Sequence, residues 1–138
     1  MNKTMHIVPP GCVGNKRALL IGINYVGQKG ALKACHNDVR NMRDFLRDVH
    51  GFQERDMLLL MDDGEHKMPT KKNIETGFRI LTSRSKPGDV VFVMFSGRFV
   101  DDRQHHVLTH WLANYCFMFC RPWWTATRRG WRRRGRDG

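Results

Sequence analysis

The stretch "PGDVVFVMFSG", residues 87–97, sets six consecutive apolar residues between a Pro-Gly turn and a Ser-Gly pair. The apolar run does not alternate with polar residues, which is typical of a strand buried on both faces of a parallel sheet. The pattern stops at once after Gly97, where Arg98 follows. The stretch therefore predicts a buried strand over 90–95 that ends at Ser96-Gly97.

Two similar apolar runs precede this strand, at Ala18–Ile23 and at Met57–Met61. Between these two runs we expect a helix that Asn37 or Asp38 caps and that ends at Gly51. The apolar residues of this helix recur at helical spacing: Val39, Met42, Phe45, Leu46 and Val49.

A second helix is expected between Thr70, its predicted N-cap, and the turn Lys86-Pro87-Gly88. Its predicted apolar face carries Ile74, Phe78 and Leu81. Strands that alternate with helices over short connections predict the α/β class, with a parallel sheet covered by flanking helices.

Parallel sheets place their chemistry at the carboxyl ends of the strands. Three polar pairs follow the three predicted strands and are expected to gather at that edge: Asn24-Tyr25, Asp62-Asp63 and Ser96-Gly97. We expect the acidic loop 62–65 to be solvated and His36 to be exposed on the first turn of its helix.

The composition fits one modest domain, because 138 residues with 41% hydrophobic content can form one core. The net charge of +11 is uneven: residues 1–97 carry 15 Lys and Arg against 10 Asp and Glu, whereas residues 98–138 carry 9 against 3. Basicity therefore belongs mainly to the tail. Residues 1–14 form a leader without the apolar region of a secretion signal.

The four cysteines, Cys12, Cys35, Cys116 and Cys120, form no CxxC pair and have no matching histidine spacing. Neither a zinc site nor a disulfide scaffold is indicated. We expect reduced thiols and a cytoplasmic location.

Three blocks, "RALLIGINYVG" (17–27), "GALKACHNDVRNM" (30–42) and "PGDVVFVMFSG" (87–97), closely resemble the first half of the catalytic domain of a type I metacaspase, a caspase-like cysteine peptidase. The resemblance covers residues 15–97 and departs at Ala34, where the family usually has glycine. It implies a caspase-like parallel sheet with flanking helices, incomplete at about three strands, followed by an irregular tail over 98–138. It also implies a calcium-dependent endopeptidase that cleaves after Arg or Lys with a His-Cys dyad.

The dyad is missing from this chain. The family's histidine follows a Ser-Gly pair, whereas Arg98 follows Ser96-Gly97 here, and a guanidinium cannot act as a general base. The segment with the nucleophilic cysteine is absent. We therefore assign no catalytic residue to this chain. We also assign no metal ligand, because the resemblance implies calcium only for the intact domain.

The resemblance places Asp38 at the acidic residue of the specificity pocket, where a carboxylate pairs with a substrate Arg or Lys. Cys35 and Ser96 line the same pocket. The alternative is that Asp38 only caps its helix and Cys35 only packs, and both roles can hold together.

The tail has a reading-frame explanation. If residues 121–138 are translated out of frame, then codons read one nucleotide later turn Trp123, Trp124 and Trp131 into glycine. Degenerate codons permit Gly-His-Gly-Gly-Gln from residue 121 and an acidic run after it, as the family has beyond its third strand. We therefore interpret residues 98–120 as translated intron and residues 121–138 as out-of-frame exon.

Two other classes of function stay open. In the first, the seven arginines and three tryptophans of residues 121–138 bind polyanions, or the apolar positions from Val107 to Phe119 form a helix on a membrane surface. In the second, the chain is a catalytically dead regulator that retains the substrate pocket or pairs with an intact relative. In that case its third strand lacks its next neighbour, which leaves an open edge prone to aggregation.

Overall fold

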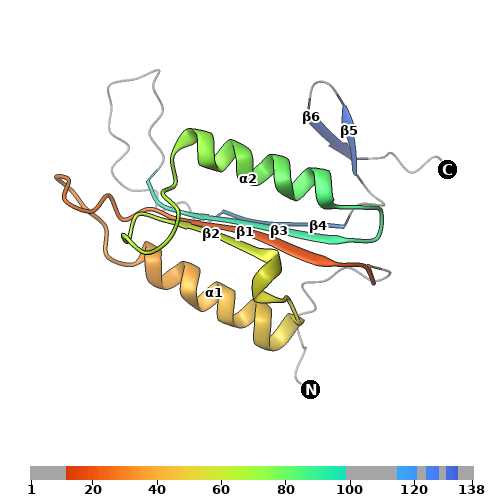
Figure 1. Cartoon of the computed structure of the whole chain (residues 1–138), viewed down its shortest axis with the longest axis horizontal. Helices are drawn as coiled ribbons and strands as arrows, with labels where there is room; N and C mark the ends of the chain where they lie inside the picture. The colour runs from red at the N-terminus through yellow and green to blue at the C-terminus, as the bar shows by residue number, and fades with distance from the viewer. Residues whose placement is uncertain (1–11, 99–114, 121–123, 128–129, 134–138) are drawn as a thin grey trace.

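The computed structural model describes residues 12–98, 115–120, 124–127 and 130–133. Strand β1 (Lys16–Gly22) is followed by helix α1 (Cys35–His50), the short 3₁₀ helix η1 (Glu54–Asp56), strand β2 (Met57–Met61), helix α2 (Lys71–Arg84) and strand β3 (Val90–Ser96). The expected fold class is confirmed: β1 pairs in parallel with β2 and with β3, and the helices lie on opposite faces of the sheet (Figure 1).

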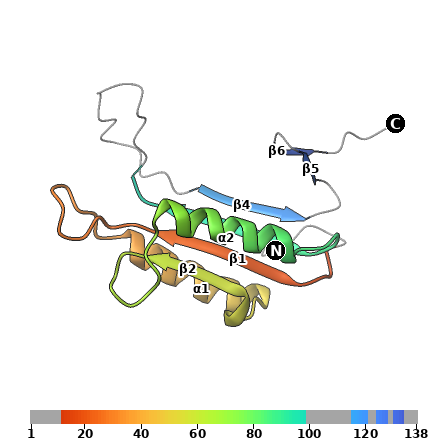
Figure 2. The same ribbon diagram turned by 45° about the horizontal axis from the view of Figure 1, so that its top comes forward.

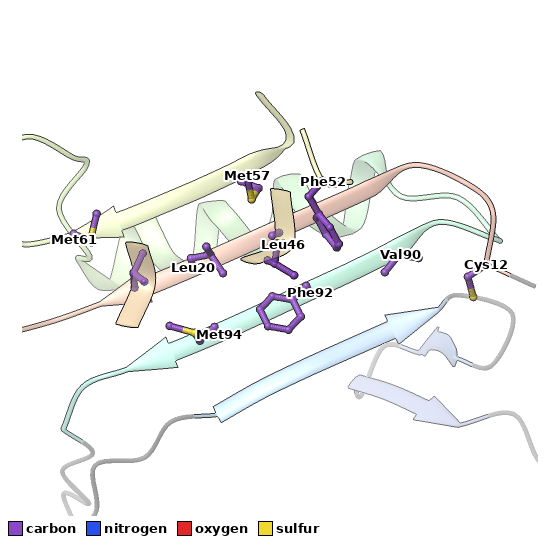
Figure 3. Packing of buried hydrophobic residues seen from close by; sticks show 11 residues of the cluster. Cys12, Leu20, Leu46, Phe52, Met57, Met61, Val90, Phe92 and Met94 are labelled. Carbon is purple, nitrogen blue, oxygen red and sulfur yellow. The ribbon is translucent and has the colours of Figure 1, made fainter. Parts of the chain in front are cut away.

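β1 is the central strand of this parallel unit, and its residues divide the core into two layers. Leu20 points toward α1 and packs with Leu46, Phe92 and Met94 (Figure 3). Leu19 and Ile21 belong to the opposite layer, which includes Leu60, Leu81 and Val93. The unbroken apolar runs of the three strands are thus explained, because both faces are covered.

α1 lies very close to the end of β1. A Cβ atom on Gly22 would lie 2.7 Å from Cγ2 of Val39 and 2.9 Å from the carbonyl oxygen of Cys35. Glycine is therefore required at this position by the approach of the helix backbone.

The predicted N-cap of α2 and the predicted end of α1 are confirmed, whereas the predicted apolar face of α1 is partly wrong. Thr70 caps α2 as predicted, since its hydroxyl accepts a hydrogen bond from the backbone N–H of Asn73 at 3.2 Å. Gly51 ends α1 with φ 70° as predicted. The predicted apolar face of α1 is too wide, however, because Phe45 and Val49 are exposed.

Three further strands lie in the tail: β4 (Tyr115–Cys120), β5 (Trp124–Thr127) and β6 (Gly130–Arg133). β4 pairs antiparallel with β3 and extends the sheet to the order β2-β1-β3-β4, so the expected open edge of the third strand is wrong. Because Tyr115–Cys120 is a strand, the alternative of a membrane-surface helix is also wrong over those residues. Positions 107–112 of that helix, and most of the leader, lie outside the described residues.

Figure 2 shows the arrowheads of β1 and β2 at one edge of the sheet, with β4 running in the opposite direction. In the part of the chain that the structure describes, no helix has the length and apolarity needed to span a bilayer. Cys12 is disulfide-bonded, contrary to the expected reduced thiols, whereas Cys35 is a buried free thiol.

Asp89 ties together the amino ends of β1 and β3. Its carboxylate accepts hydrogen bonds from the backbone N–H groups of Asn15 and Lys86 and from the guanidinium of Arg17, each at 2.9 Å. Burial by itself would raise the pKa of Asp89, but these hydrogen bonds outweigh it and hold the pKa below its ordinary value.

We expect Asp89→Asn to lower the free energy of unfolding at neutral pH by about 2 kcal/mol, because the buried network loses its negative charge and one of its two acceptor oxygens. A pKa that is lowered in the folded state gives stability that is present above the unfolded pKa and is lost as pH falls through the folded value. Urea unfolding at several pH values should therefore show the deficit of the variant shrinking below about pH 4. Glu75→Gln, an exposed substitution on α2, is the control; a deficit that stays constant down to low pH would contradict the prediction.

Candidate functional site

The loops that follow β1, β2 and β3 meet at the carboxyl edge of the sheet, as the sequence predicted. Asn24 follows β1, Asp62 follows β2, and Ser96 is the last residue of β3. The backbone N–H of Asn24 donates to Oδ1 of Asp62 at 2.9 Å, and the backbone N–H of Val26 donates to Oδ2 at 3.2 Å. The carboxylate of Asp62 thereby fixes the β1 loop against the end of β2.

His36 also binds Asp62, with Nε2 2.6 Å from Oδ1. The expectation that His36 is exposed is wrong, because only 8% of the surface of His36 is exposed. Burial by itself would raise the pKa of Asp62, but hydrogen bonds from Asn24, His36 and Val26 lower it below its ordinary value. Asp62 is consequently a structural junction of β1, β2 and α1, and the expected solvated loop does not describe it.

The amino end of α1 is capped from a distance. The helix begins at Cys35 with Ala34 as N-cap, and no N-cap side chain accepts a hydrogen bond. Instead, Oδ1 of the buried Asn24 accepts a hydrogen bond from the backbone N–H of Cys35 at 3.0 Å. The prediction of Asn37 or Asp38 as N-cap is wrong, because Asn24 satisfies this helix end through the tertiary structure.

Freed from capping, Asp38 lies on the first turn of α1 and faces β3. The hydroxyl of Ser96 donates to Oδ2 of Asp38 at 2.8 Å. Ser96 also interacts with the thiol of Cys35 and acts to lower its pKa. The structure thus brings together the three residues that the sequence singled out for substrate binding.

The thiol of Cys35 is not activated. Burial raises its pKa above the ordinary value; the interaction with Ser96 acts in the opposite direction, and the charges of Asp38 and Asp62 raise the pKa further. A thiol with a raised pKa is protonated at neutral pH, and the nucleophilic form is the thiolate. Cys35 therefore suits a pocket wall rather than a nucleophile.

The side chain of Arg98 contacts the loop that follows β1. Its guanidinium donates to the carbonyl oxygen of Gly30 and lies 5.6 Å from the centroid of the Tyr25 ring. The hydroxyl of Tyr25 donates to the carbonyl oxygen of Arg98 at 2.8 Å. Tyr25 adopts a left-handed conformation with φ 55°, which is unusual for a residue other than glycine. Arg98 therefore fastens loop 25–30 to the end of β3.

Comparison with known proteins identifies the family. The family model described as "Metacaspase, peptidase C14 domain" matches residues 16–112, which is more than half of the chain. The chain belongs to the metacaspase family. The match begins at the first residue of β1 and continues past Arg98, so it contains every residue of the site.

Individual metacaspases are similar to this chain over the same region. Metacaspase III c of Phaeodactylum tricornutum is 47% identical over 98 residues, which are 70% of this chain and 29% of that protein. Metacaspase-1 of Botryotinia fuckeliana is 47% identical over 88 residues, which are 62% of this chain and 21% of that protein. Metacaspase-1B of Aspergillus fumigatus is 46% identical over 88 residues, 62% of this chain and 22% of that protein. The chain thus spans less than a third of these curated relatives.

Calcium, the cofactor that the metacaspase resemblance implies, does not fit the residues described here. Asp63, Glu65 and His66 offer ligand atoms within 4.8 Å of one another. However, Oδ1 of Asp63 accepts from the backbone N–H groups of Glu65 and His66, while Oδ2 contacts the His66 ring and Arg40. Calcium prefers six to eight oxygen ligands, so an occupied carboxylate and an imidazole are a poor set.

The hydrogen bonds of Asp63 also show that it is not a solvated loop residue. Burial by itself would raise its pKa, but the backbone N–H and the ring of His66, together with the N–H of Glu65, lower the pKa to about 2. The Asp63 carboxylate orders the turn after β2. Only Glu65 matches the expectation of an exposed acidic residue.

We expect Arg98→Ala to release loop 25–30, because both guanidinium contacts are lost. Lys29 is exposed in this loop, so trypsin should cleave after Lys29 several-fold faster in the variant, as local opening becomes more frequent. Arg55→Ala is the control, since the Arg55 side chain is 79% exposed. Equal cleavage after Lys29 in the variant and the wild type would show that Arg98 does not hold the loop.

Proposed function

We propose that this chain carries the substrate side-chain pocket of a metacaspase for Arg and Lys but does not hydrolyse peptides itself. The observation that supports the pocket is the arrangement of Asp38, Ser96 and Cys35 at the carboxyl edge of the sheet. The activity of an intact metacaspase belongs to the longer proteins that this chain matches, and it enters here as part of the proposal.

Asp38 has the properties of an anchor for a cationic side chain. It is partly buried, and the Ser96 hydroxyl holds its Oδ2 at 2.8 Å, so the carboxylate is oriented before any ligand arrives. A guanidinium offers paired N–H donors that match a carboxylate, whereas an ammonium supplies a point charge. The buried, neutral wall of Cys35 beside the carboxylate favours the ion pair, because fewer water molecules compete for it.

The proposed lack of peptidase activity is supported by two side chains, those of Arg98 and Cys35. Arg98 follows Ser96-Gly97 where the resemblance expects the catalytic histidine, and its guanidinium binds Gly30 and Tyr25. The cysteine that the structure places at this edge, Cys35, is buried with a raised pKa. A cysteine peptidase needs a thiolate beside an imidazole that accepts and returns the proton. Neither half of that pair is available from Arg98 and Cys35.

Binding of Nα-acetyl-arginine amide tests the pocket. We expect Asp38→Asn to weaken binding by about tenfold or more, the usual effect of losing one charge-assisted hydrogen-bond partner. Asp44→Asn, on the exposed part of the same helix, should bind as the wild type does. The neutral isostere acetyl-citrulline amide should bind weakly to all three proteins. Equal titration curves for Asp38→Asn and the wild type would remove the pocket from the proposal.

A reporter peptide that ends in Arg or Lys tests the inactivity. The purified chain should release no more product than a mock preparation, with or without calcium. The tail interpretation adds that the transcript, sequenced across codons 97–121, should join Gly97 to the shifted frame and restore Ser-Gly-His-Gly-Gly-Gln. The product of that message should cleave the reporter. Cleavage by the present chain would overturn the inactivity, and a message without the join would overturn the intron interpretation.

The remaining parts of the proposal have less direct support. Calcium enters only for an intact domain. The cytoplasmic location is supported by the free thiol of Cys35, whereas Cys12 is disulfide-bonded. Nonspecific polyanion binding is supported by the seven arginines of residues 121–138. The side chains of those arginines lie outside the described residues.

A further inference from the structure

The edge of β3 that faces away from β1 takes no part in the proposed substrate pocket, but its backbone groups also need partners. On its inner edge, β3 pairs with β1 from Lys16↔Val90 to Gly22↔Ser96. A strand paired on one edge presents a row of unsatisfied N–H and C=O groups on the other, and this row is a template for another strand. Val90, Phe92 and Met94 are at most 3% exposed, so the strand also lies in the apolar core.

β4 occupies this edge along almost its whole length. The register is continuous over six pairs, from Val90↔Cys120 to Phe95↔Tyr115. β4 begins opposite the carboxyl end of β3, so the end of β3 and the start of β4 lie at the same end of the sheet. An antiparallel neighbour needs no crossover helix, whereas a parallel neighbour would.

The other outer strand of the sheet, β2, is covered in part by its own loop. The chain turns back after β2, so that Leu60 and Lys67 form a parallel bridge and the N–H of Met61 donates to the carbonyl oxygen of Lys67 at 3.1 Å. The six-residue β4 therefore closes the longer of the two potential edges with a segment of the same chain.

We infer that Tyr115–Cys120 is an intramolecular capping strand that prevents β3 from pairing with a strand of another chain. The occupant of the edge is this segment, because its register, its direction and its connection to the end of β3 all fit. A second copy of this chain, or an intact metacaspase, would have to displace six paired residues before it could add a strand here. The inference concerns the sheet edge and does not depend on the peptidase proposal.

The register gives a direct test by cross-linking in the full chain. Met94 lies opposite Cys116, and residues opposite one another have Cβ atoms about 4.5–5.5 Å apart. Cys12 is disulfide-bonded, so the variants of this test carry Cys12→Ser, which keeps Cys116 from being held by that disulfide. Met94→Cys should then form a disulfide with Cys116 under mild oxidation, detected by mass spectrometry of the joined peptides. Val93→Cys, whose side chain points to the opposite face, should not join to Cys116. A Cys116 link of equal yield in both variants, or in neither, would overturn the register.

A second test addresses the block on pairing between chains. Alternate residues of a strand direct their N–H groups to one neighbour, so prolines at two adjacent positions, Phe117→Pro with Met118→Pro, remove at least one donor to β3. The variant should form oligomers in size-exclusion chromatography with light scattering. Its monomer, isolated at high dilution, should lose hydrogen-exchange protection at the N–H groups of residues 90–95 that do not face β1. The control, Asp101→Pro with Asp102→Pro, should stay monomeric like the wild type. A double-proline strand variant that stays monomeric with β3 still protected would overturn the inference.

Discussion

The structure depends on β1, a strand that is buried on both faces and paired in parallel on both edges. Ala18, Leu19 and Leu20 are at most 1% exposed, so every backbone polar group of this strand must find a partner in a neighbouring strand. Parallel partners require helical crossovers, and α1 and α2 supply them while they cover the two faces. The same parallel arrangement brings the carboxyl ends of β1, β2 and β3 to one edge, and this edge is where the candidate site lies.

At that edge, hydrogen bonds from polar side chains hold the loops and the start of α1 so that Asp38 faces β3. Asn24 satisfies the first N–H of α1, and Asp62 holds the backbone of Asn24 in place. Asp38 then contacts Ser96 rather than its own helix end. The sequence resemblance singled out Asp38, Ser96 and Cys35, and these residues lie together in the structure. The position after Ser96-Gly97 departs from the resemblance. Arg98 holds loop 25–30 through its contacts with the carbonyl oxygen of Gly30 and the ring of Tyr25. The imidazole of a catalytic dyad would not make the same contacts.

At the outer edge of β3, the backbone N–H and C=O groups need hydrogen-bond partners. The segment Tyr115–Cys120 supplies them, although it belongs to a tail of unusual composition. Strand pairing satisfies N–H and C=O groups and demands little of side chains beyond β propensity. The run Tyr115–Cys120 is apolar and free of proline and glycine, which is sufficient for pairing whatever the origin of the tail. The capping strand is therefore compatible with the reading-frame interpretation, because it needs no selected function in the tail.

The sequence by itself determined the three buried strands, both helices and their parallel order, because unbroken apolar runs and helical spacing are local patterns. It also determined the cap at Thr70 and the end of α1 at Gly51, where the residue and its partner are neighbours in the chain. Only the tertiary structure decided that Asn24 caps α1, that His36 is buried against Asp62, and that β4 closes the sheet. Each of these three contacts joins residues more than ten positions apart, and a local pattern cannot reveal which distant group will satisfy a buried donor or acceptor.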